Sequence, residues 1–259
     1  MRTSHLQRLL GGAVAALAAL ALAAPLAQGA TPAEGYEDFA GCPSPSENPE
    51  VAICMHSLIK GGNFKMGSKD VPLDKPMTLT GGLNAELGGF AANSEGGLSE
   101  VKQLVPGGLI GITGLEWLVN FLTLGQLKLY AVTELVGEPE IGEGLTLPIR
   151  VHLINSALGG GCYVGSVSNP IVLNLSEAVE PEFSIDEELG IVKFLNGTYV
   201  DNTFSAPGAN GCTLYLLGFV PISINGLVNS TAGLPAGSGS NETEQDIDIE
   251  IAPSELVYP

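Results

Sequence analysis

Two segments of this 259-residue chain alternate between apolar and polar side chains, and this pattern constrains the fold more than any other feature. Residues 145–153 carry an aliphatic side chain at every odd position. Residues 244–251 place four carboxylates at the even positions and isoleucine at three of the four odd ones. Side chains on a β-strand point alternately to opposite faces of the sheet. Each segment is therefore predicted to be a strand with one buried face.

The first of these strands has a predicted inner and outer side. The aliphatic residues that we expect to face the core are Leu147, Ile149, Val151 and Leu153. Arg150 and His152 point the other way and are expected to be exposed. Pro148 has no amide hydrogen to donate to a neighbouring strand, so it places this segment near a sheet edge or a bulge.

Glycine and short β-rich runs extend the prediction to most of the chain. Glycine supplies 32 of the 230 residues from 30 to 259, about twice its usual share, and it marks many turns. Further β-rich runs lie at residues 77–80, 127–136, 170–175, 190–195, 212–220 and 221–225. We predict a mainly β fold, an antiparallel sandwich or barrel-like domain with one short helix, which occupies residues 61–259 as a single domain.

The predicted helix covers residues 113–124. Thr113 and Glu116 have the spacing of a capping box, and Gly125 suits the left-handed position that ends a helix. The alternative is a membrane segment over residues 104–124, but Pro106 and four glycines interrupt that run. We expect a helix that caps the β core.

The first 29 residues have the three zones of a secretory signal peptide. A short basic start precedes an apolar run over residues 9–24, and small residues follow at Ala27 and Gly29. The apolar run is 16 residues long, shorter than the ~20 that a membrane-spanning helix needs. We expect cleavage after Gly29, with Ala30 and Ala33 as alternative positions.

Residues 39–42 read Phe-Ala-Gly-Cys, which looks like the cleavage box of a lipoprotein. A lipid-modified cysteine directly follows the apolar segment, whereas nine polar or mixed residues, 31–39, separate that segment from this box. We therefore predict that Cys42 carries no lipid anchor.

The chain that remains after cleavage, residues 30–259, is strongly acidic. It keeps eight of the ten basic residues and all 28 acidic ones, so its formal net charge is −20. Nucleic acid and anionic membrane surfaces would repel such a protein. We expect a secreted or cell-envelope protein that binds no nucleic acid and does not insert into a membrane after the signal peptide is removed.

The four cysteines, Cys42, Cys54, Cys162 and Cys212, form an even set, as is typical of disulfide-bonded exported proteins. Zinc is the rival interpretation, but zinc sites use closely spaced cysteine pairs, and neighbouring cysteines here are separated by 11, 107 and 49 residues. Four cysteines allow three connectivities. We favour 42–54 and 162–212, because the last two cysteines both follow a glycine and begin strand-like runs. The first pair would staple residues 30–60 into an irregular leader.

No motif in the sequence supports catalysis. The chain lacks the Gly-x-Ser-x-Gly turn of serine hydrolases and the His-Glu-x-x-His of zinc proteases. Neither His56 nor His152 stands in a recognisable nucleophile–base motif. Acidic pairs such as Glu138 and Glu140 would need a cleft to act on sugars, and the chain has a single tryptophan to line one. We predict no catalytic residues, no cofactor and no enzymatic activity.

The acidic face of residues 244–251 contains the weak candidates for metal ligands, Asp246 and Asp248. Calcium prefers several oxygen ligands that converge from a loop, whereas a straight strand spaces the side chains of one face about 7 Å apart. We favour the solvated face of an amphipathic strand, whose charges would also protect a sheet edge from pairing with other chains.

Several segments together look familiar. They are LPIRV at 147–151, GCYVGS at 161–166, SNPIVLNL at 168–175 and VDNTFSAPGANGC at 200–212. With residues 39–54 and 130–139, they resemble a family of uncharacterised secreted proteins from actinobacteria. The resemblance covers most of the chain after residue 29, while residues 176–190 and the acidic tail fit it less well. It implies export and a bacterial origin, and it implies no activity.

The leading hypothesis is therefore a non-enzymatic extracellular or cell-envelope β module, with a binding or adhesive role. An envelope pore or barrel is the alternative, because alternating strands and an acidic lumen suit a channel, although membrane barrels need strands of ~9–11 residues and aromatic girdles. A secreted hydrolase is the third candidate, and it lacks the nucleophile–base pair.

Overall fold

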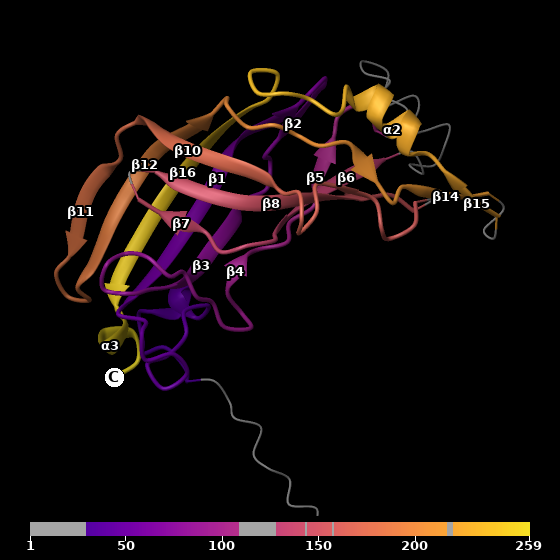
Figure 1. Cartoon of the computed structure of the whole chain (residues 1–259). Helices are drawn as coiled ribbons and strands as arrows, with labels where there is room; N and C mark the ends of the chain where they lie inside the picture. The colour runs from indigo at the N-terminus through magenta and orange to yellow at the C-terminus, as the bar shows by residue number, and fades with distance from the viewer. Residues whose placement is uncertain (1–29, 109–127, 143, 157, 217–219) are drawn as a thin grey trace, which may run out of the picture.

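The structure is a computed structural model that describes residues 30–108, 128–142, 144–156, 158–216 and 220–259. The predicted signal peptide and the predicted helix at 113–124 lie outside these residues. The described residues form a mainly β fold of antiparallel strands, which confirms the predicted fold class (Figure 1).

Most of the described elements are strands, and several of them are only two residues long. The strands are β1 (Ile53–Met66), β2 (Lys69–Pro72), β3 (Met77–Leu83), β4 (Gly97–Leu98), β5 (Gln103–Val105), β6 (Leu129–Leu135), β7 (Glu140–Ile141), β8 (Leu145–Ile154), β9 (Tyr163–Val164), β10 (Ile171–Val179), β11 (Glu182–Asp186), β12 (Ile191–Asp201), β13 (Ala209–Asn210), β14 (Thr213–Leu216), β15 (Val220–Ser223) and β16 (Glu242–Pro253). The helical elements are the 3-10 helix η1 (Glu37–Phe39), α2 (Asn225–Ala232) and α3 (Ser254–Val257).

Apart from β14 and β15, which pair only with each other, the described strands form two layers that share β10. The long sheet has the order β4-β3-β1-β16-β12, with β2 paired to β1 and β11 paired to β12. The short sheet is built on β8, which pairs with β6, β7 and β9. The first half of β10 pairs with β8 and its second half pairs with β12, so this strand passes from one sheet to the other. Within the described residues the arrangement does not close into a barrel.

The main core lies between the two sheets. Figure 1 shows β12, β16 and β1 of the long sheet running side by side toward α3, with β8 of the short sheet running across them. Ile59, Leu79 and Ile247 of the long sheet are buried in the same cluster as Ile149 and Ile171 of the short sheet. Both layers therefore contribute an apolar inner face, as a sandwich requires.

Strand β8 has the inner face that its sequence predicts. Leu147, Ile149, Val151 and Leu153 are all buried, at 0–7% exposure. The prediction that Arg150 and His152 are exposed is wrong, because both side chains are half-buried against neighbours on the outer face. Those neighbours come from β6 and β9, which β8 meets through long-range pairing that its own pattern does not encode.

Pro148 lies in an interior strand, and a gap between two neighbours accommodates it. On one side β8 pairs with β10. On the other side β6 pairs with β8 as far as Ile149, and β7 begins to pair at Thr146. Pro148 stands between those two pairings, where the ladder tolerates a strand residue without an amide hydrogen.

Strand β16 is also interior, hydrogen-bonded to β1 on one side and β12 on the other. Its carboxylates therefore do not protect an edge, contrary to the expectation from the sequence. The predicted alternation holds as far as Ile247, which faces the core, next to Asp246, which is exposed on the outer face; residues 248–251 are all half-buried.

The N-terminal segment packs on the outer face of the long sheet and forms a second, smaller core. Phe39, Val51 and Ile191 are buried there together with Val257 of α3. Residues 30–52 are irregular apart from η1, and β1 begins at Ile53, so the end of the predicted leader, residues 53–60, belongs to a central strand.

Both predicted disulfides are confirmed. Cys42 bonds to Cys54 within the second core, and Cys162 bonds to Cys212 beside β9 and β13. The second bond brings the two glycine-preceded turns together. Gly211 has a φ of +69°, and a Cβ there would lie 2.0 Å from the carbonyl oxygen of Gly161. Two disulfides are typical of proteins that fold in an oxidising environment.

A buried carboxylate fixes the end of β12. Asp201 is 3% exposed and accepts hydrogen bonds from the backbone amide of Asn174, the backbone amide of Thr203 and the hydroxyl of Thr203, each at 2.7 Å. This side chain ties β10 to the loop that follows β12.

Candidate functional site

The two histidines that the structure describes lie on the outer faces of different sheets. His56 is half-buried on β1, and its Nδ1 lies 2.9 Å from the Thr80 hydroxyl on β3. His152 lies on β8 in the short sheet. The structure therefore does not bring the two histidines into one site.

His152 belongs to a polar cluster with Glu134, Arg150 and Tyr163. Glu134 accepts a hydrogen bond from Arg150 Nε at 2.7 Å, and its other oxygen lies 3.2 Å from His152 Nδ1. The His152 ring stacks on Tyr163 with centroids 4.3 Å apart, and the Arg150 guanidinium lies 4.2 Å from the same ring.

This cluster resembles part of a catalytic triad, since a carboxylate orients a histidine. However, His152 Nε2 is buried and has no hydrogen-bond partner among the described residues. A triad needs a nucleophile at that nitrogen. The described cluster therefore contains a carboxylate, Glu134, that orients His152, but it contains no nucleophile at His152 Nε2.

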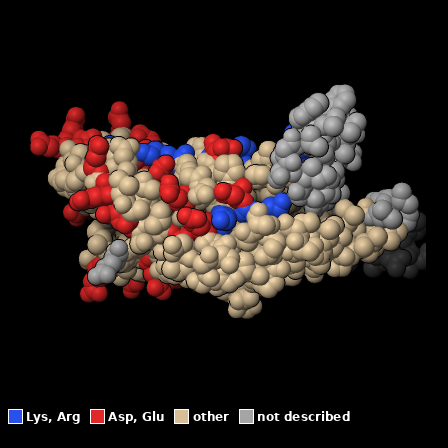
Figure 2. Space-filling model, turned by 90° about the horizontal axis from the view of Figure 1, so that it is seen from above, with Lys and Arg blue, Asp and Glu red and all other residues tan. Residues whose placement is uncertain are grey.

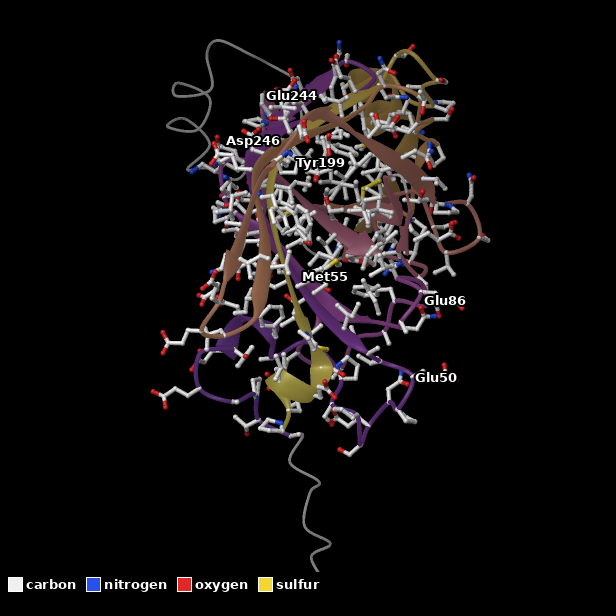
Figure 3. All side chains as sticks on the ribbon, turned by 90° about the vertical axis from the view of Figure 1, so that its left-hand side faces the viewer. Glu50, Met55, Glu86, Tyr199, Glu244 and Asp246 are labelled. Carbon is white, nitrogen blue, oxygen red and sulfur yellow. A yellow bond between two sulfur atoms is a disulfide. The ribbon has the colours of Figure 1, made fainter. Side chains whose placement is uncertain are left out.

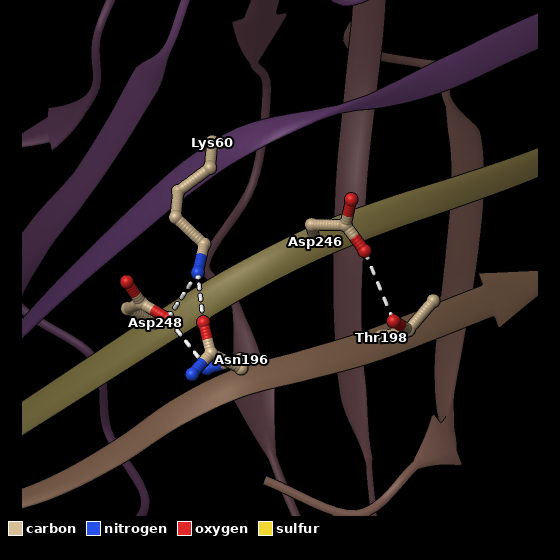
Figure 4. Close-up of polar contacts among 5 residues, drawn as sticks. All are labelled: Lys60, Asn196, Thr198, Asp246 and Asp248. Atoms are coloured by element: carbon tan, nitrogen blue, oxygen red, sulfur yellow. Dashed lines mark hydrogen bonds and ion pairs between the residues drawn. The ribbon is translucent and has the colours of Figure 1, made fainter.

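The carboxylates of the weak metal candidates, Asp246 and Asp248, interact with other protein groups, as Figure 4 shows. Asp248 Oδ1 lies 2.7 Å from Lys60 Nζ and accepts the backbone amide of Asn196 at 2.6 Å. Asp246 accepts a hydrogen bond from the Thr198 hydroxyl at 2.9 Å. In the part of the chain that the structure describes, no three ligand-type side chains gather in a group that could hold a metal ion.

A groove of about 310 Å³ opens between the two sheets, and no sequence motif marks it. Its floor is the inner face of the long sheet, where Phe194, Ile249 and Ser57 form one cross-strand row and Ile251 and Met55 the next. The opposite wall is the β7–β8 hairpin, through Ile141 and Leu145. In Figure 3, Met55 and Tyr199 lie along the floor, between the ribbons of the two sheets.

The crossing of β10 creates this opening. Leu175 is the last residue of β10 that pairs with β8, and Ser176 is the first that pairs with β12. Beyond this point the hairpin of β7 and β8 faces the long sheet. Gly144 lets the hairpin approach β10 closely, because a Cβ there would lie 2.4 Å from the Leu175 carbonyl oxygen.

Three side chains give the groove its polar character. Ser57 lies on the floor, and Tyr199 and Glu177 are cross-strand partners at one end. Glu177 is the one charged side chain among the described lining residues. Burial raises the pKa of the Tyr199 phenol, and the negative charge of Glu177 raises it further. The groove is thus apolar along most of its length, with a carboxylate and a neutral phenol at one end.

Leu87 lines the groove, and its backbone conformation is strained. Its φ is +61°, a left-handed conformation that costs a leucine of order 1–2 kcal/mol. The turn is fixed by Asn84, whose side-chain oxygen accepts the amides of Glu86 and Gly88 at 2.9 and 3.0 Å. Leu87 remains 45% exposed. Strained residues concentrate at ligand clamps and active sites, where the surrounding structure holds them in place.

No sequence motif predicts this groove, because its lining comes from segments that are far apart in the chain. The isoleucines of residues 244–251 were expected to face the core, but Ile249 and Ile251 are only half-buried because the short sheet ends above them. The sequence contains one related signal, because Phe183 and Ile185 alternate with polar residues in an acidic segment. In the structure these two apolar side chains are 62% and 52% exposed.

Comparisons with known proteins identify no relative: no family model, no curated protein and no solved structure matches the chain. Within the described ranges, no helix combines the length and apolar character that crossing a membrane requires. The groove is therefore the feature on which a function can be argued.

Proposed function

We propose that the protein is an exported, non-enzymatic binding module that holds a small apolar ligand in the groove between its sheets. The groove itself carries this proposal. Ligand pockets are concave and mostly apolar, with few polar groups, and they typically start near 300 Å³, which matches the groove described here. The two disulfides support export, and the absence of a nucleophile at His152 among the described residues supports a role without catalysis.

The size of the groove sets the size of the ligand. A methylene group occupies about as much space as a water molecule, roughly 30 Å³, so a groove of 310 Å³ accommodates a chain of about ten carbons. Each buried methylene contributes about 0.8 kcal/mol. Every added carbon should therefore tighten binding by up to about fourfold until the groove is full.

A chain-length series tests the proposal. Linear alcohols from hexanol to dodecanol are titrated against protein that carries bound N-phenyl-1-naphthylamine, and displacement is followed by the fluorescence of this neutral probe. We expect Kd to fall with each carbon and to level off at about ten carbons. A Kd that keeps falling through dodecanol, or a probe that does not bind, contradicts a groove of this size.

A groove-filling variant locates the binding. Ser57→Phe places a phenyl ring on the groove floor, while Ser184→Phe places the same ring on the exposed outer face of β11. We expect Ser57→Phe to abolish decanol binding and Ser184→Phe to leave it unchanged, with thermal unfolding showing that both variants fold. Should Ser57→Phe fold poorly, Leu145→Asn on the opposite wall provides a second test. Unchanged decanol binding in a folded groove variant means that the ligand binds elsewhere.

A further inference from the structure

The charge around the groove is strongly one-sided. Residues 177–188, which run from β10 through β11 to the turn before β12, contain six acidic residues and no basic one. Five of the six are exposed and the sixth, Asp186, is half-buried. Figure 2 shows acidic side chains gathered at the end of the molecule where this segment lies. Glu177 belongs to both the segment and the groove lining.

The ring of Tyr199 is the cross-strand neighbour of this carboxylate, and two further aromatic rings lie farther along the same sheet. Tyr199 is directly opposite Glu177 on the neighbouring strand, so their Cβ atoms are about 5 Å apart on the same face of the sheet. Phe194 continues the floor from Tyr199, and Phe183 packs against it with ring centroids 5.6 Å apart. Burial and Glu177 both keep the Tyr199 phenol neutral by raising its pKa.

A carboxylate beside a tyrosine ring, at the end of an apolar groove whose floor continues with Phe194, matches one kind of head group. Quaternary ammonium groups bind to the faces of Tyr and Phe rings and are attracted by carboxylates. We propose that the groove takes single-chain amphiphiles with an alkylammonium head, the head lying against Glu177 and Tyr199 and the chain running over Phe194 and Ile249. This inference rests on the proposed function and narrows its ligand class.

The same geometry disfavours anionic amphiphiles. A fatty-acid carboxylate placed at Tyr199 would face Glu177, and the described lining residues offer it no basic side chain. A head group directed to the opposite end, near Leu83 and Leu87, would lie among apolar side chains. Either orientation leaves the anion without a compensating partner, which is costly in an apolar environment.

Three probes with the same chain separate the head-group effect from the chain effect. Decyltrimethylammonium, decanol and decanoate are each used below their micelle concentrations to displace N-phenyl-1-naphthylamine. We expect decyltrimethylammonium to bind roughly 3- to 30-fold more tightly than decanol, the range given by one exposed cation–π contact and one exposed ion pair. Decanoate should bind more weakly than decanol.

Charge-removing variants test the assigned residue. Glu177→Gln should reduce the preference for decyltrimethylammonium over decanol by about 1.4- to 5-fold, while the Kd of decanol stays the same. Glu188→Gln removes the same charge from the same segment at a residue that does not line the groove, and it should change the preference little. Tyr199→Leu should lower the preference while keeping the apolar wall.

The outcomes distinguish this inference from the proposed function. Equal affinities for the cation and the alcohol would leave the apolar groove standing and overturn the assignment of the head group. A preference that Glu177→Gln and Glu188→Gln reduce equally would also overturn it, since diffuse attraction by the acidic segment would then explain the result. If no probe is displaced, both the function and the ligand class are wrong.

Discussion

Substitution of Leu87 can measure the backbone strain at this residue of the groove wall. Replacing it with asparagine removes an apolar wall and introduces a residue that tolerates the left-handed conformation at φ +61°. Leu87 is 45% exposed, so it retains about 1 kcal/mol of the ~2 kcal/mol that full burial of a leucine provides. Relief of the backbone strain returns about 1 kcal/mol. We therefore expect Leu87→Asn to change the free energy of unfolding by less than about 0.5 kcal/mol.

Leu145→Asn is the matched control for this measurement. Leu145 is also half-buried in the groove wall, but it lies in β8, and its φ is not among the positive values. Its replacement loses a similar burial and adds the low strand propensity of asparagine, so it should destabilise by about 2 kcal/mol. Urea denaturation with an unchanged m-value gives both numbers, and both variants should weaken decanol binding. Equal destabilisation by the two variants would show that Leu87 is not strained.

Three other features lead to predictions of stability. Replacing Cys162 and Cys212 together by serine opens a loop with a sequence separation of 50 and should cost about 4 kcal/mol in the chain-entropy model, measured by urea denaturation of the oxidised proteins. Asp201→Ala leaves buried donors without their acceptor and should cost about 3–5 kcal/mol, whereas Asp246→Asn on the exposed face should cost less than about 0.5 kcal/mol in the same assay. Burial, reinforced by nearby carboxylates, raises the pKa of Tyr258, so its contribution to stability is complete below the unfolded pKa of about 10 and is lost as the pH rises through the higher folded value. As the pH rises from roughly 9 to 12, the stability of the Tyr258→Phe variant should therefore fall less than the stability of the wild type, as followed by thermal unfolding.

The sequence predicted the features that do not require knowledge of which strands pair. The inner face of β8, including Val151, follows from a period of two that any half-buried strand must have. The disulfides 42–54 and 162–212 followed from the even number of cysteines and from the glycines before the second pair. The first signal is local and the second is a count of cysteines over the chain, so neither requires knowledge of strand pairing.

The features that the sequence did not predict all depend on long-range pairing. Arg150 and His152 are half-buried because Glu134 and Tyr163 lie on the neighbouring strands β6 and β9. Pro148 suggested an edge, but its missing donor coincides with the gap between β6 and β7. Each of these outcomes depends on where a strand begins or ends on the opposite side of β8, and the sequence of β8 itself contains no such information.

The groove depends on the same kind of information, through β10. This strand alternates buried and exposed residues only as far as Leu175, and its remaining residues are exposed as it leaves β8 for β12. The pattern is thus lost at the point where the strand changes sheets and where acidic residues begin. That coincidence has a physical reason: a strand half that covers no core needs no apolar inner face, and Glu177 can occupy a position that would otherwise require an aliphatic side chain. The carboxylate at the end of the groove and the opening of the groove therefore have one cause, the transfer of β10 to the long sheet.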